Sequence, residues 1–452
     1  MRQDLKKSRV IKIIQMNKIP GFIISAPNSG AGKTIITLGL LRAIKDRGIK
    51  VQPYKNGPDY IDPGFHHVAS NKKSYNLDTW AMNDELIEQI IQKSDDSGLI
   101  VAEGSMGFYD GVVKKGFSGF GSTAELSEKF GWPVILVLNV SGQAQSAAAT
   151  ALGFINYNKN INFAGVILNF VASERHEFLI KEGMKLAGIN VLGVIPRQKE
   201  LLLPERHLGL IQAEETINLE TKIQEYAHLI KKNVDLNQII DVARSNFFSK
   251  KSDKLIPPPA QRIALAFDKA FSFTYPHILD SWINAGVEVI PFSPLNNEVP
   301  NKNVNLIWLP GGYPELYAKD LSEAHLTRDA LKKMSPNVKI HGECGGYMSL
   351  GEVLIDKNGD NFKMFGLLGL VSSYEKKKLH LGYRMAKIKN SFNNYSNFQV
   401  IRGHEFHYSS IISQPDTELY EVFDANNKIV KETGSFRGNT SGTFFHAICG
   451  VS

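Results

Sequence analysis

A glycine-rich loop between an apolar stretch and an amphipathic stretch constrains this chain more than any other feature. The segment GFIISAPNSGAGKTIITLGLL starts at Gly21 and reads as a strand, a tight loop and a helix. Gly30 and Gly32 let the loop backbone turn its N–H groups inward. Lys33 supplies a cation for the β- and γ-phosphates of a nucleotide, and Thr34 can ligate Mg²⁺. The helix expected from Lys33 onward adds its positive end, so the segment predicts an ATP-binding P-loop.

Two acidic residues are expected beside Thr34 as partners for the metal ion. Glu103 ends the apolar stretch LIVAEG, and Asp59 follows another strand end in YKNGPDYIDPGFH. Either residue alone could be a helix cap or a turn residue. Because Mg²⁺ on a P-loop needs carboxylate, water and phosphate oxygens, the pattern favours a magnesium site that includes both carboxylates.

The segment around Asp59 also gathers Lys55, Asp62 and His66 into one loop rich in Gly and Pro. Charged residues on a rigid loop at the ligand-binding edge of a sheet indicate handling of substrate or phosphate. A solvated surface loop is the alternative interpretation.

The strand pattern predicts an α/β protein of two domains. Near-continuous apolar runs such as PVILVLNV and FAGVILNF are typical of strands buried on both faces of a parallel sheet with helices between them. Composition changes at NFFSKKSDKLIPPPAQ, where three prolines cannot continue a helix or a central strand. We therefore expect a basic extension at residues 1–19, a P-loop domain at 20–245, a linker at 246–261 and a second doubly wound domain at 262–452.

The second domain contains a candidate nucleophile. KIHGECGGYMSL places Cys344 directly after an apolar strand and before a glycine pair and a helix start, as in a nucleophile elbow. The helix start is expected to lower the pKa of the thiol, and the Gly345 N–H can stabilise an oxyanion. The loop LPGGYPEL, with Gly311 and Gly312, is a second candidate source of oxyanion donors.

A thiolate nucleophile needs a base, and three histidines are candidates. His404 and His407 lie in RGHEFHYSS, and His446 lies in SGTFFHAICG. Spacing alone does not choose among them, although His446 follows an apolar, strand-like stretch late in the domain. The other cysteine, Cys449, lacks the strand–turn–helix context and is read as a small buried hydrophobe.

Bulk properties exclude several classes of protein. The net charge is +7, but the lysines are scattered, so we expect small acidic ligands rather than nucleic acid. No apolar run reaches the roughly 18 residues of a membrane span, so we expect no membrane partner. The chain has two cysteines, which makes a reducing cytoplasm the default. The basic extension lacks the apolar region and the cleavage site expected of a signal peptide. A transit peptide is an alternative, and translation starting at Met16 is the simpler explanation.

The residues of this chain resemble the cobyrinic acid a,c-diamide synthase family from Gly21 to the C-terminus. The segments that carry the resemblance occur in the family's order; they are SAPNSGAGKT, YKNGPDYIDPGFH, NLDTW, AEGSMGFYDG, GSTAEL, SGQAQSAAA, GVILN, GVIPR, LPERHLGL, FSFTYPHILD, PGGYPEL, GECGGYM, LGYR and RGHEFHYS. The resemblance implies a first domain similar to dethiobiotin synthetase and a second with the flavodoxin-like class I glutamine amidotransferase fold.

The resemblance also implies a chemistry for the first domain. Members use ATP and glutamine to convert the a and c acetate groups of a corrin polycarboxylate into amides during cobalamin biosynthesis. ATP would phosphorylate the carboxylate, while Lys33 and a magnesium ion neutralise the charge that develops. The magnesium ion would be held by Thr34, Asp59 and Glu103. By the same resemblance, the residues near the reacting carboxylate are Lys55, Asp59, Asp62 and Asn76.

In the second domain the resemblance assigns Cys344 as the nucleophile and His446 as the proton shuttle of a glutaminase. The usual Glu two residues after the histidine is Ile448 here, which implies a Cys–His dyad. Released ammonia must reach the acyl phosphate without becoming ammonium, so the domains should share a sheltered interface.

Three matters stay open from the sequence. The macrocycle could be cobyrinic acid, hydrogenobyrinic acid or nickel-sirohydrochlorin, since all three present acetate groups on a tetrapyrrole rim. A P-loop regulatory ATPase of the MinD type is the alternative from another class, although such a protein has no need of a glutaminase half. The order of the two amidations and the oligomeric state are also open, with a homodimer among the options.

Overall fold

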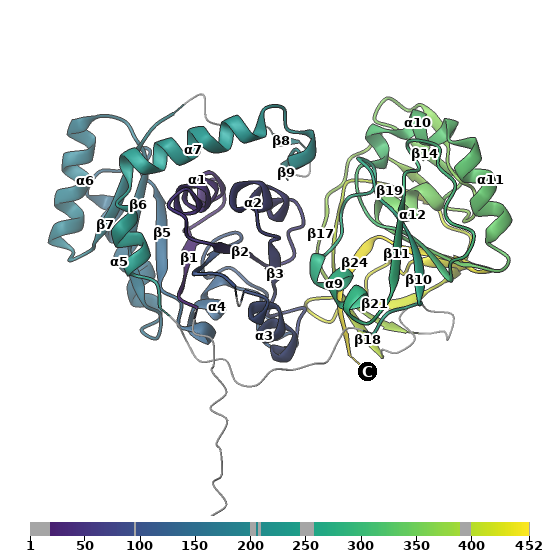
Figure 1. The fold of residues 1–452 in the computed structure, drawn as a ribbon, viewed down its shortest axis with the longest axis horizontal. Coiled ribbons are helices and arrows are strands. Elements are labelled where there is room, and N and C mark those ends of the chain that lie inside the picture. The colour runs from purple at the N-terminus through teal and green to yellow at the C-terminus, as the bar shows by residue number, and fades with distance from the viewer. Residues whose placement is uncertain are drawn as a thin grey trace, which may run out of the picture.

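The computed structural model describes residues 19–94, 96–198, 205–206, 209–244, 257–388 and 399–451, and they form two lobes joined side by side (Figure 1). Residues 1–18 of the expected extension at 1–19 and residues 246–256 of the expected linker at 246–261 lie outside the described residues. The domain boundaries therefore stay a prediction.

The first lobe is built on a parallel sheet of seven strands in the order β3-β2-β4-β1-β5-β6-β7. All five residues of the central strand β1 are buried, as expected for a strand covered on both faces. The strands are β1 (Gly21–Ser25), β2 (Val51–Asn56), β3 (Tyr75–Leu77), β4 (Leu99–Glu103), β5 (Val134–Asn139), β6 (Phe163–Val171) and β7 (Val191–Pro196). Strand β8 (Glu205–Arg206) pairs antiparallel with β9 (Gly209–Leu210).

Helices cover both faces of this sheet (Figure 1). One face carries α1 (Lys33–Lys45), α2 (Asp62–Ser70) and α7 (Leu219–Asn233), and the other carries α3 (Asp84–Gln92) and α4 (Thr123–Phe130). The remaining helices are α5 (Ser146–Tyr157), α6 (Glu174–Leu186), α8 (Leu236–Asp241) and the 3-10 turn η1 (Ala213–Glu215). The start of α4 is fixed by a capping box in which Ser122 and Glu125 satisfy each other's backbone N–H groups.

The second lobe has a mixed sheet of seven strands in the order β11-β10-β12-β13-β23-β22-β20. The first five are parallel, and the last two pair antiparallel. The strands are β10 (Arg262–Ala266), β11 (Glu288–Phe292), β12 (Leu306–Leu309), β13 (Lys339–Glu343), β20 (Thr417–Glu418), β22 (Ser435–Arg437) and β23 (Thr440–Thr443). The helices are α9 (Pro276–Asn284), η2 (Pro314–Leu316), α10 (Ala318–Glu323), α11 (His325–Met334) and α12 (Gly345–Leu350). The expected α/β class is confirmed for both lobes.

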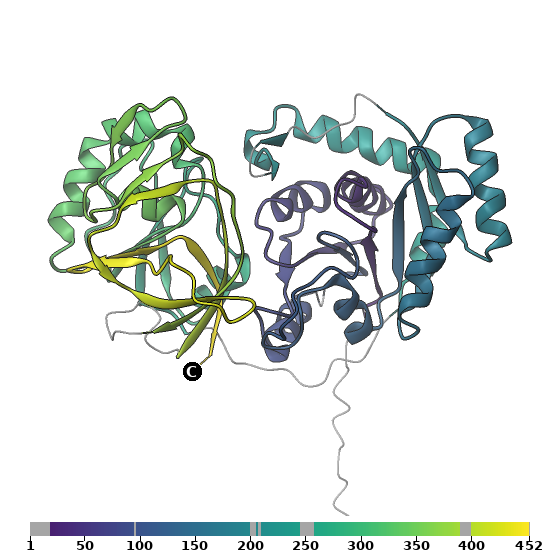
Figure 2. The same cartoon turned by 180° about the vertical axis from the view of Figure 1, so that it is seen from behind.

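Two further sheets of four strands extend the second lobe, whose last strands are yellow in the view from behind (Figure 2). The antiparallel sheet has the order β21-β17-β18-β24 and places His404 of β18 opposite His446 of β24. Its strands are β17 (His380–Ile388), β18 (Val400–His407), β21 (Tyr420–Asp424) and β24 (Phe445–Val451). The other sheet consists of β14 (Val353–Ile355), β15 (Asn361–Lys363), β16 (Val371–Ser373) and β19 (Ser410–Ser413).

The antiparallel sheet joins the lobes. The hydroxyl of Tyr383 on β17 donates to Asp78 Oδ2 at 2.9 Å, and Arg402 Nη1 on β18 donates to the Trp80 carbonyl at 2.8 Å. One buried apolar cluster contains residues of both lobes, Trp80 from the first and Tyr275 from the second among them. Because burial of apolar surface is the main stabilising term of a fold, this shared core fixes the relative position of the lobes. Among the described helices, none combines the length and the hydropathy of a bilayer span.

Candidate active site

The P-loop follows β1 and runs into the first turn of α1. Gly30 and Gly32 have φ values of 76° and 90°, a region that favours glycine. A Cβ added to Gly32 would lie 2.3 Å from Asn169 Nδ2 at the end of β6. That amide donates to the Ala31 carbonyl at 2.9 Å and supports the loop from β6, which is separated from β1 by β5. Sequence analysis did not single out Asn169, because its role depends on a contact between segments far apart in the chain.

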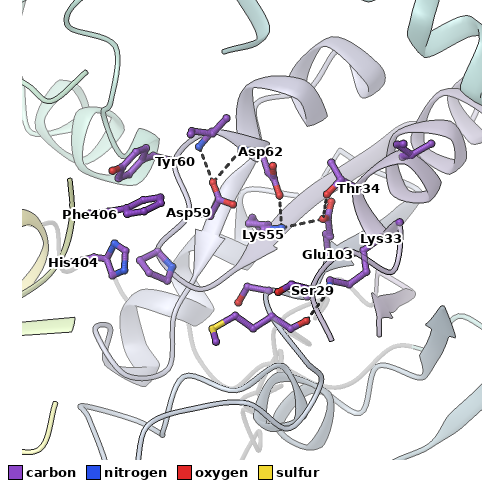
Figure 3. Close-up of a pocket in the computed structure, with 18 of the residues that line it drawn as sticks. Ser29, Lys33, Thr34, Lys55, Asp59, Tyr60, Asp62, Glu103, His404 and Phe406 are labelled. Atoms are coloured by element: carbon purple, nitrogen blue, oxygen red, sulfur yellow. Dashed lines mark hydrogen bonds and ion pairs between the residues drawn. The ribbon is translucent and has the colours of Figure 1, made fainter. Parts of the chain in front are cut away.

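Lys33 extends over the P-loop at one end of the pocket (Figure 3). Its Nζ donates to the Met106 carbonyl at 2.6 Å and to the Asn28 carbonyl at 3.1 Å. Burial and, to a smaller extent, the positive charge of Lys55 lower the pKa of Lys33 to about 8. The ammonium group of Lys33 is therefore held by carbonyl dipoles, and a bound anion such as a phosphate would stabilise its charged form.

Glu103 lies at the centre of the site, at the carboxyl end of β4. Its Oε1 accepts from Thr34 Oγ1 at 2.8 Å and from Lys55 Nζ at 2.9 Å, and its Oε2 is 2.7 Å from His66 Nε2 (Figure 3). Burial raises the pKa of this fully buried carboxyl, but Lys55 and His66 outweigh that effect and hold the pKa well below its usual range. Glu103 is therefore a fixed negative charge beside the P-loop.

Lys55 at the end of β2 joins two of the predicted acidic residues. Its Nζ contacts both Asp62 Oδ2 and Glu103 Oε1. Burial lowers the pKa of Lys55, yet the two carboxylates outweigh burial and raise it above its usual value. Lys55 thus stays charged in the floor of the pocket, next to the position where a phosphate or carboxylate would be handled.

The loop before α2 places Asp59 at the pocket wall. Asp59 Oδ1 accepts from the N–H groups of Ile61 and Asp62 at 2.8 and 3.2 Å, which forms an Asx-type turn directly before α2. Asn76 lies behind the loop, where its Nδ2 donates to the carbonyls of Gly57 and Asp59 at 2.9 and 2.6 Å. The structure therefore brings Lys55, Asp59 and Asp62 to the pocket, while Asn76 holds the loop that carries Asp59.

The pocket has a volume of about 530 Å³ and is lined by both lobes. Lys33 and Thr34 lie at one end, and Tyr60, His404 and Phe406 lie at the other (Figure 3). His404 and Phe406 come from β18 of the second lobe. The pocket is thus completed at the junction between the lobes.

Cys344 occupies a strained turn between β13 and α12. Its φ is 46° and its ψ is −103°, which is rare for a residue with a side chain. The Cys344 N–H donates to the Thr443 carbonyl at 2.7 Å. Thr443 lies three positions before His446 in the sequence. A Cβ on Gly346 would lie 1.9 Å from the Leu309 carbonyl oxygen, so the turn needs glycine there. This is the geometry of a nucleophile elbow.

The predicted oxyanion donors gather around the elbow. A Cβ on Gly345 would lie 2.9 Å from the Gly312 nitrogen, and a Cβ on Gly311 would lie 2.1 Å from His446 Cε1. Burial raises the pKa of the Cys344 thiol well above its usual range, and this effect outweighs the backbone N–H of Gly345, which acts in the opposite direction. The expected lowering by the helix start is therefore present but smaller than the effect of burial.

His446 is the candidate histidine that lies against Gly311 of the predicted oxyanion loop. It is buried, and burial lowers its pKa to about 3, so the imidazole is neutral at neutral pH. Glu343 Oε2 lies 3.8 Å from His446 Nδ1, and Glu343 Oε1 accepts from the Ala447 N–H at 3.3 Å. Because Ile448 replaces the usual Glu, the sequence predicted a Cys–His dyad with no carboxylate near the histidine. The structure places a different carboxylate, that of Glu343, near the His446 imidazole.

The other two candidate histidines have different surroundings. His407 lies in an ion-pair cluster, with Nε2 2.9 Å from Glu405 Oε1 and Nδ1 2.9 Å from Ser409 Oγ, while Arg384 binds the other oxygen of Glu405. His404 lines the pocket, and burial lowers its pKa to about 4. Its Nδ1 has no hydrogen-bond partner among the residues that the structure describes.

Comparison with known families divides the chain into the same two parts. Residues 22–211 match the CobQ/CobB/MinD/ParA nucleotide binding domain, and residues 262–451 match the CobB/CobQ-like glutamine amidotransferase domain. The first match covers the P-loop, and the second covers Cys344, Glu343 and His446.

Similar proteins span the whole chain. A hydrogenobyrinate a,c-diamide synthase of Rhodobacter capsulatus is 50% identical over 430 residues, which cover 95% of this chain and 99% of that protein. Proteins of the same name from Mesorhizobium japonicum and Agrobacterium fabrum are each 44% identical, over 95% and 94% of this chain and 98% of each relative.

Proposed function

The chain belongs to the family of the hydrogenobyrinate a,c-diamide synthases, and from this premise we propose that it amidates the a and c acetate groups of hydrogenobyrinate. It is a glutamine-dependent, amide-forming ligase with an ATP-binding domain. The names of the relatives support the cobalt-free macrocycle ahead of cobyrinic acid and nickel-sirohydrochlorin. Cobyrinic acid remains the second candidate, because it presents the same acetate groups.

The first step takes place in the P-loop pocket. The carboxylate oxygen of the substrate attacks the γ-phosphorus of ATP, and the bond to the β-phosphate breaks to give an acyl phosphate and ADP. Lys33 exchanges its carbonyl acceptors for phosphate oxygens and neutralises charge on the transferred group. Lys55, held by Glu103 and Asp62, presents a second fixed positive charge to the reacting carboxylate.

The donor set beside the P-loop fits a magnesium ion. Thr34 Oγ1 and the carboxylates of Glu103 and Asp59 are oxygen donors, which Mg²⁺ prefers, and Thr34 and Glu103 already lie 2.8 Å apart. Both hydrogen bonds that the described residues give Asp59 use Oδ1. A bound magnesium ion would supply further positive charge to the phosphates. The residues that would hold the ion are Thr34, Asp59 and Glu103, and the contacts of Lys55 and His66 with Glu103 fix the orientation of its carboxylate.

The second step takes place at the elbow. His446 takes the proton of the Cys344 thiol as the sulfur attacks the amide carbon of glutamine, and the N–H groups of Gly345 and Gly312 stabilise the oxyanion. Since burial raises the pKa of Cys344 and lowers that of His446, the resting pair is neutral and the proton moves during the attack. His446 returns the proton to the leaving ammonia, and water hydrolyses the thioester to glutamate.

The observation that carries this proposal is the position of β18 between the two centres. His404 on β18 lines the P-loop pocket and pairs in register with His446 on β24. Ammonia released at Cys344 therefore meets the acyl phosphate at the junction of the lobes, where it displaces phosphate and forms the amide. We place the reaction in the cytoplasm, because both cysteines are free, and we leave a homodimer as the assembly to test.

Incubation with each macrocycle tests the proposal. The protein is mixed with Mg-ATP, glutamine and one of hydrogenobyrinate, cobyrinate or nickel-sirohydrochlorin, and the product mass is measured. We expect the diamide from hydrogenobyrinate. If only cobyrinate or only nickel-sirohydrochlorin gave a diamide, that macrocycle would be the substrate instead of hydrogenobyrinate. The absence of an amide from all three would contradict the proposed function.

A further inference from the structure

Tyr60 extends from the first lobe into the aromatic lining of the second. It directly follows Asp59 in the loop that enters α2. Its ring centroid lies 4.3 Å from that of Phe273 and 4.8 Å from that of His446, and it meets the ring of Tyr275 edge-on at 6.2 Å. The ring therefore covers the proposed base of the glutaminase from the side of the P-loop pocket.

Tyr60 also borders two cavities. It lines the pocket of about 530 Å³ that contains Lys33 and Glu103, and it lines a second cavity of about 510 Å³ that runs along Phe273 between the lobes. Figure 3 shows Tyr60 beside Phe406 and His404 at the end of the first pocket. A ring in this position separates the space around the acyl phosphate from the glutaminase centre.

The hydroxyl of Tyr60 is close enough to Cys344 for their charges to interact. Burial raises the pKa of Tyr60 well above its usual value, and the thiolate of Cys344 adds to the rise. The side chain is therefore neutral; it follows Asp59 in the chain and lies within electrostatic range of Cys344.

Contacts between rings hold Tyr60 in place. Its buried hydroxyl has no hydrogen-bond partner within the described part of the chain. Tyr275, in the same interface, differs in this respect, because its hydroxyl donates to the Pro58 carbonyl at 2.8 Å. The Tyr60 ring can therefore shift without breaking a hydrogen bond, whereas a similar shift of Tyr275 would break one.

Building on the proposed function, we propose that the ring of Tyr60 is a partition that closes the passage for ammonia between Cys344 and the acyl phosphate until the substrate is in place. Ammonia that meets bulk water at neutral pH is protonated and loses the lone pair that it needs for attack. A ring that closes the passage from the solvent-filled pocket protects ammonia until the reacting carboxylate is in place. Because Tyr60 follows Asp59, a substrate held beside Asp59 would lie next to the ring and could move it.

The test compares Tyr60→Ala with Tyr60→Phe, and it uses Tyr275→Phe as the matched control from the same interface. Each protein receives Mg-ATP, hydrogenobyrinate and glutamine in a buffer that contains ¹⁵N-labelled ammonium. We expect the wild type, Tyr60→Phe and Tyr275→Phe to form about one amide per glutamate, as the reaction stoichiometry requires. In Tyr60→Ala, glutamate per amide and the ¹⁵N content of the amide should both rise several-fold. Synthesis from ammonium alone is measured in the same variant, so that any change in the P-loop pocket itself is seen separately.

A second measurement does not require a tetrapyrrole. Alkylation of Cys344 by iodoacetamide is followed by peptide mass spectrometry, with Cys449 of the same chain as the internal reference. Removing the ring should speed alkylation of Cys344 several-fold and leave Cys449 unchanged. Tyr60→Leu replaces Tyr60→Ala if the smaller side chain prevents folding.

Two results would overturn the partition. One is an unchanged glutamate-to-amide ratio and alkylation rate in both Tyr60→Ala and Tyr60→Leu. The other is a leak in Tyr60→Phe as large as that in Tyr60→Ala, since the hydroxyl and not the ring would then matter. Failure of the proposed function has a different signature, because it would abolish amide formation in the wild type and leave the alkylation measurement intact.

Discussion

Glu343 and His446 face each other at 3.8 Å, although they lie on different sheets of the second lobe. The carboxylate comes from the end of β13, one residue before the nucleophile, and the imidazole comes from β24. At this distance the carboxylate makes no hydrogen bond with the imidazole, whose two ring nitrogens have no hydrogen-bond partner among the described residues, but its negative charge favours the imidazolium that forms during attack.

We therefore expect Glu343→Gln to slow glutamine hydrolysis by about 100-fold, the low end of the contribution of general acid–base catalysis. Synthesis from ammonium should stay close to wild type, because the P-loop pocket is intact. Glutamate release and amide formation are measured separately. Glu343→Asp should recover part of the activity; equal glutamate release by all three proteins would remove Glu343 from the site.

Replacing Cys344 with Ala should separate the two half-reactions. Glutamine-dependent synthesis is lost because no thioester can form, whereas ammonium-dependent synthesis remains. Cys449→Ala is the matched control, because that buried thiol lies outside the elbow. If Cys344→Ala folded normally but lost both activities, the assignment of glutamine hydrolysis to the second lobe and amide synthesis to the first would be wrong.

Lys55 should be needed for stability as well as for synthesis. Lys55→Met leaves Asp62 and Glu103 buried without their shared ammonium partner, and breaking a buried pair in this way costs about 3 to 5 kcal/mol. Lys73→Met is the control, because its contact with Asp280 is more exposed and is expected to be worth about 1 kcal/mol or less. Chemical denaturation measures both changes, and a similar loss in the two variants would contradict the assignment.

The buried histidines should make the fold sensitive to acid. Burial lowers the pKa of His277 to about 4 and that of His341 to about 3, from 6.5 in the unfolded chain. Below pH 6.5 the unfolded chain binds protons that the folded chain excludes, so stability falls as the pH drops toward the folded pKa, by about 1.4 kcal/mol per pH unit for each histidine.

The variant His341→Gln isolates one of these contributions. It keeps a polar group near Ser441, the hydrogen-bond partner of His341, but it does not titrate. Between pH 6.5 and 4 the free energy of unfolding should fall less steeply in His341→Gln than in the wild type. Parallel pH profiles for the two proteins would show that His341 does not contribute.

Local patterns predicted the parts of the site that are built within one segment. The P-loop from Gly30 to Thr34 and the elbow at Cys344 each combine a strand, a turn and a helix start in consecutive residues, and both have the expected backbone geometry. Glu103 could be predicted because parallel strands end at the same edge of a sheet.

Contacts between distant segments could not be predicted in this way. The bond between His66 and Glu103 depends on how α2 packs on the sheet, and the approach of Glu343 to His446 depends on two sheets meeting. In the sequence Tyr60 is one aromatic residue of a loop, and its contacts with the second lobe are seen only in the folded structure. The pKa of Cys344 is set by burial, which the helix-start pattern does not report.

The shared apolar core has a consequence for modularity. Although the sequence suggests a break near the prolines at 257–259, Trp80 of the first lobe and Tyr275 of the second are buried in the same cluster. Cutting the chain there would expose on each fragment a hydrophobic face that the other lobe now covers. Each lobe produced alone would therefore lose part of its buried core and would carry an apolar surface prone to association.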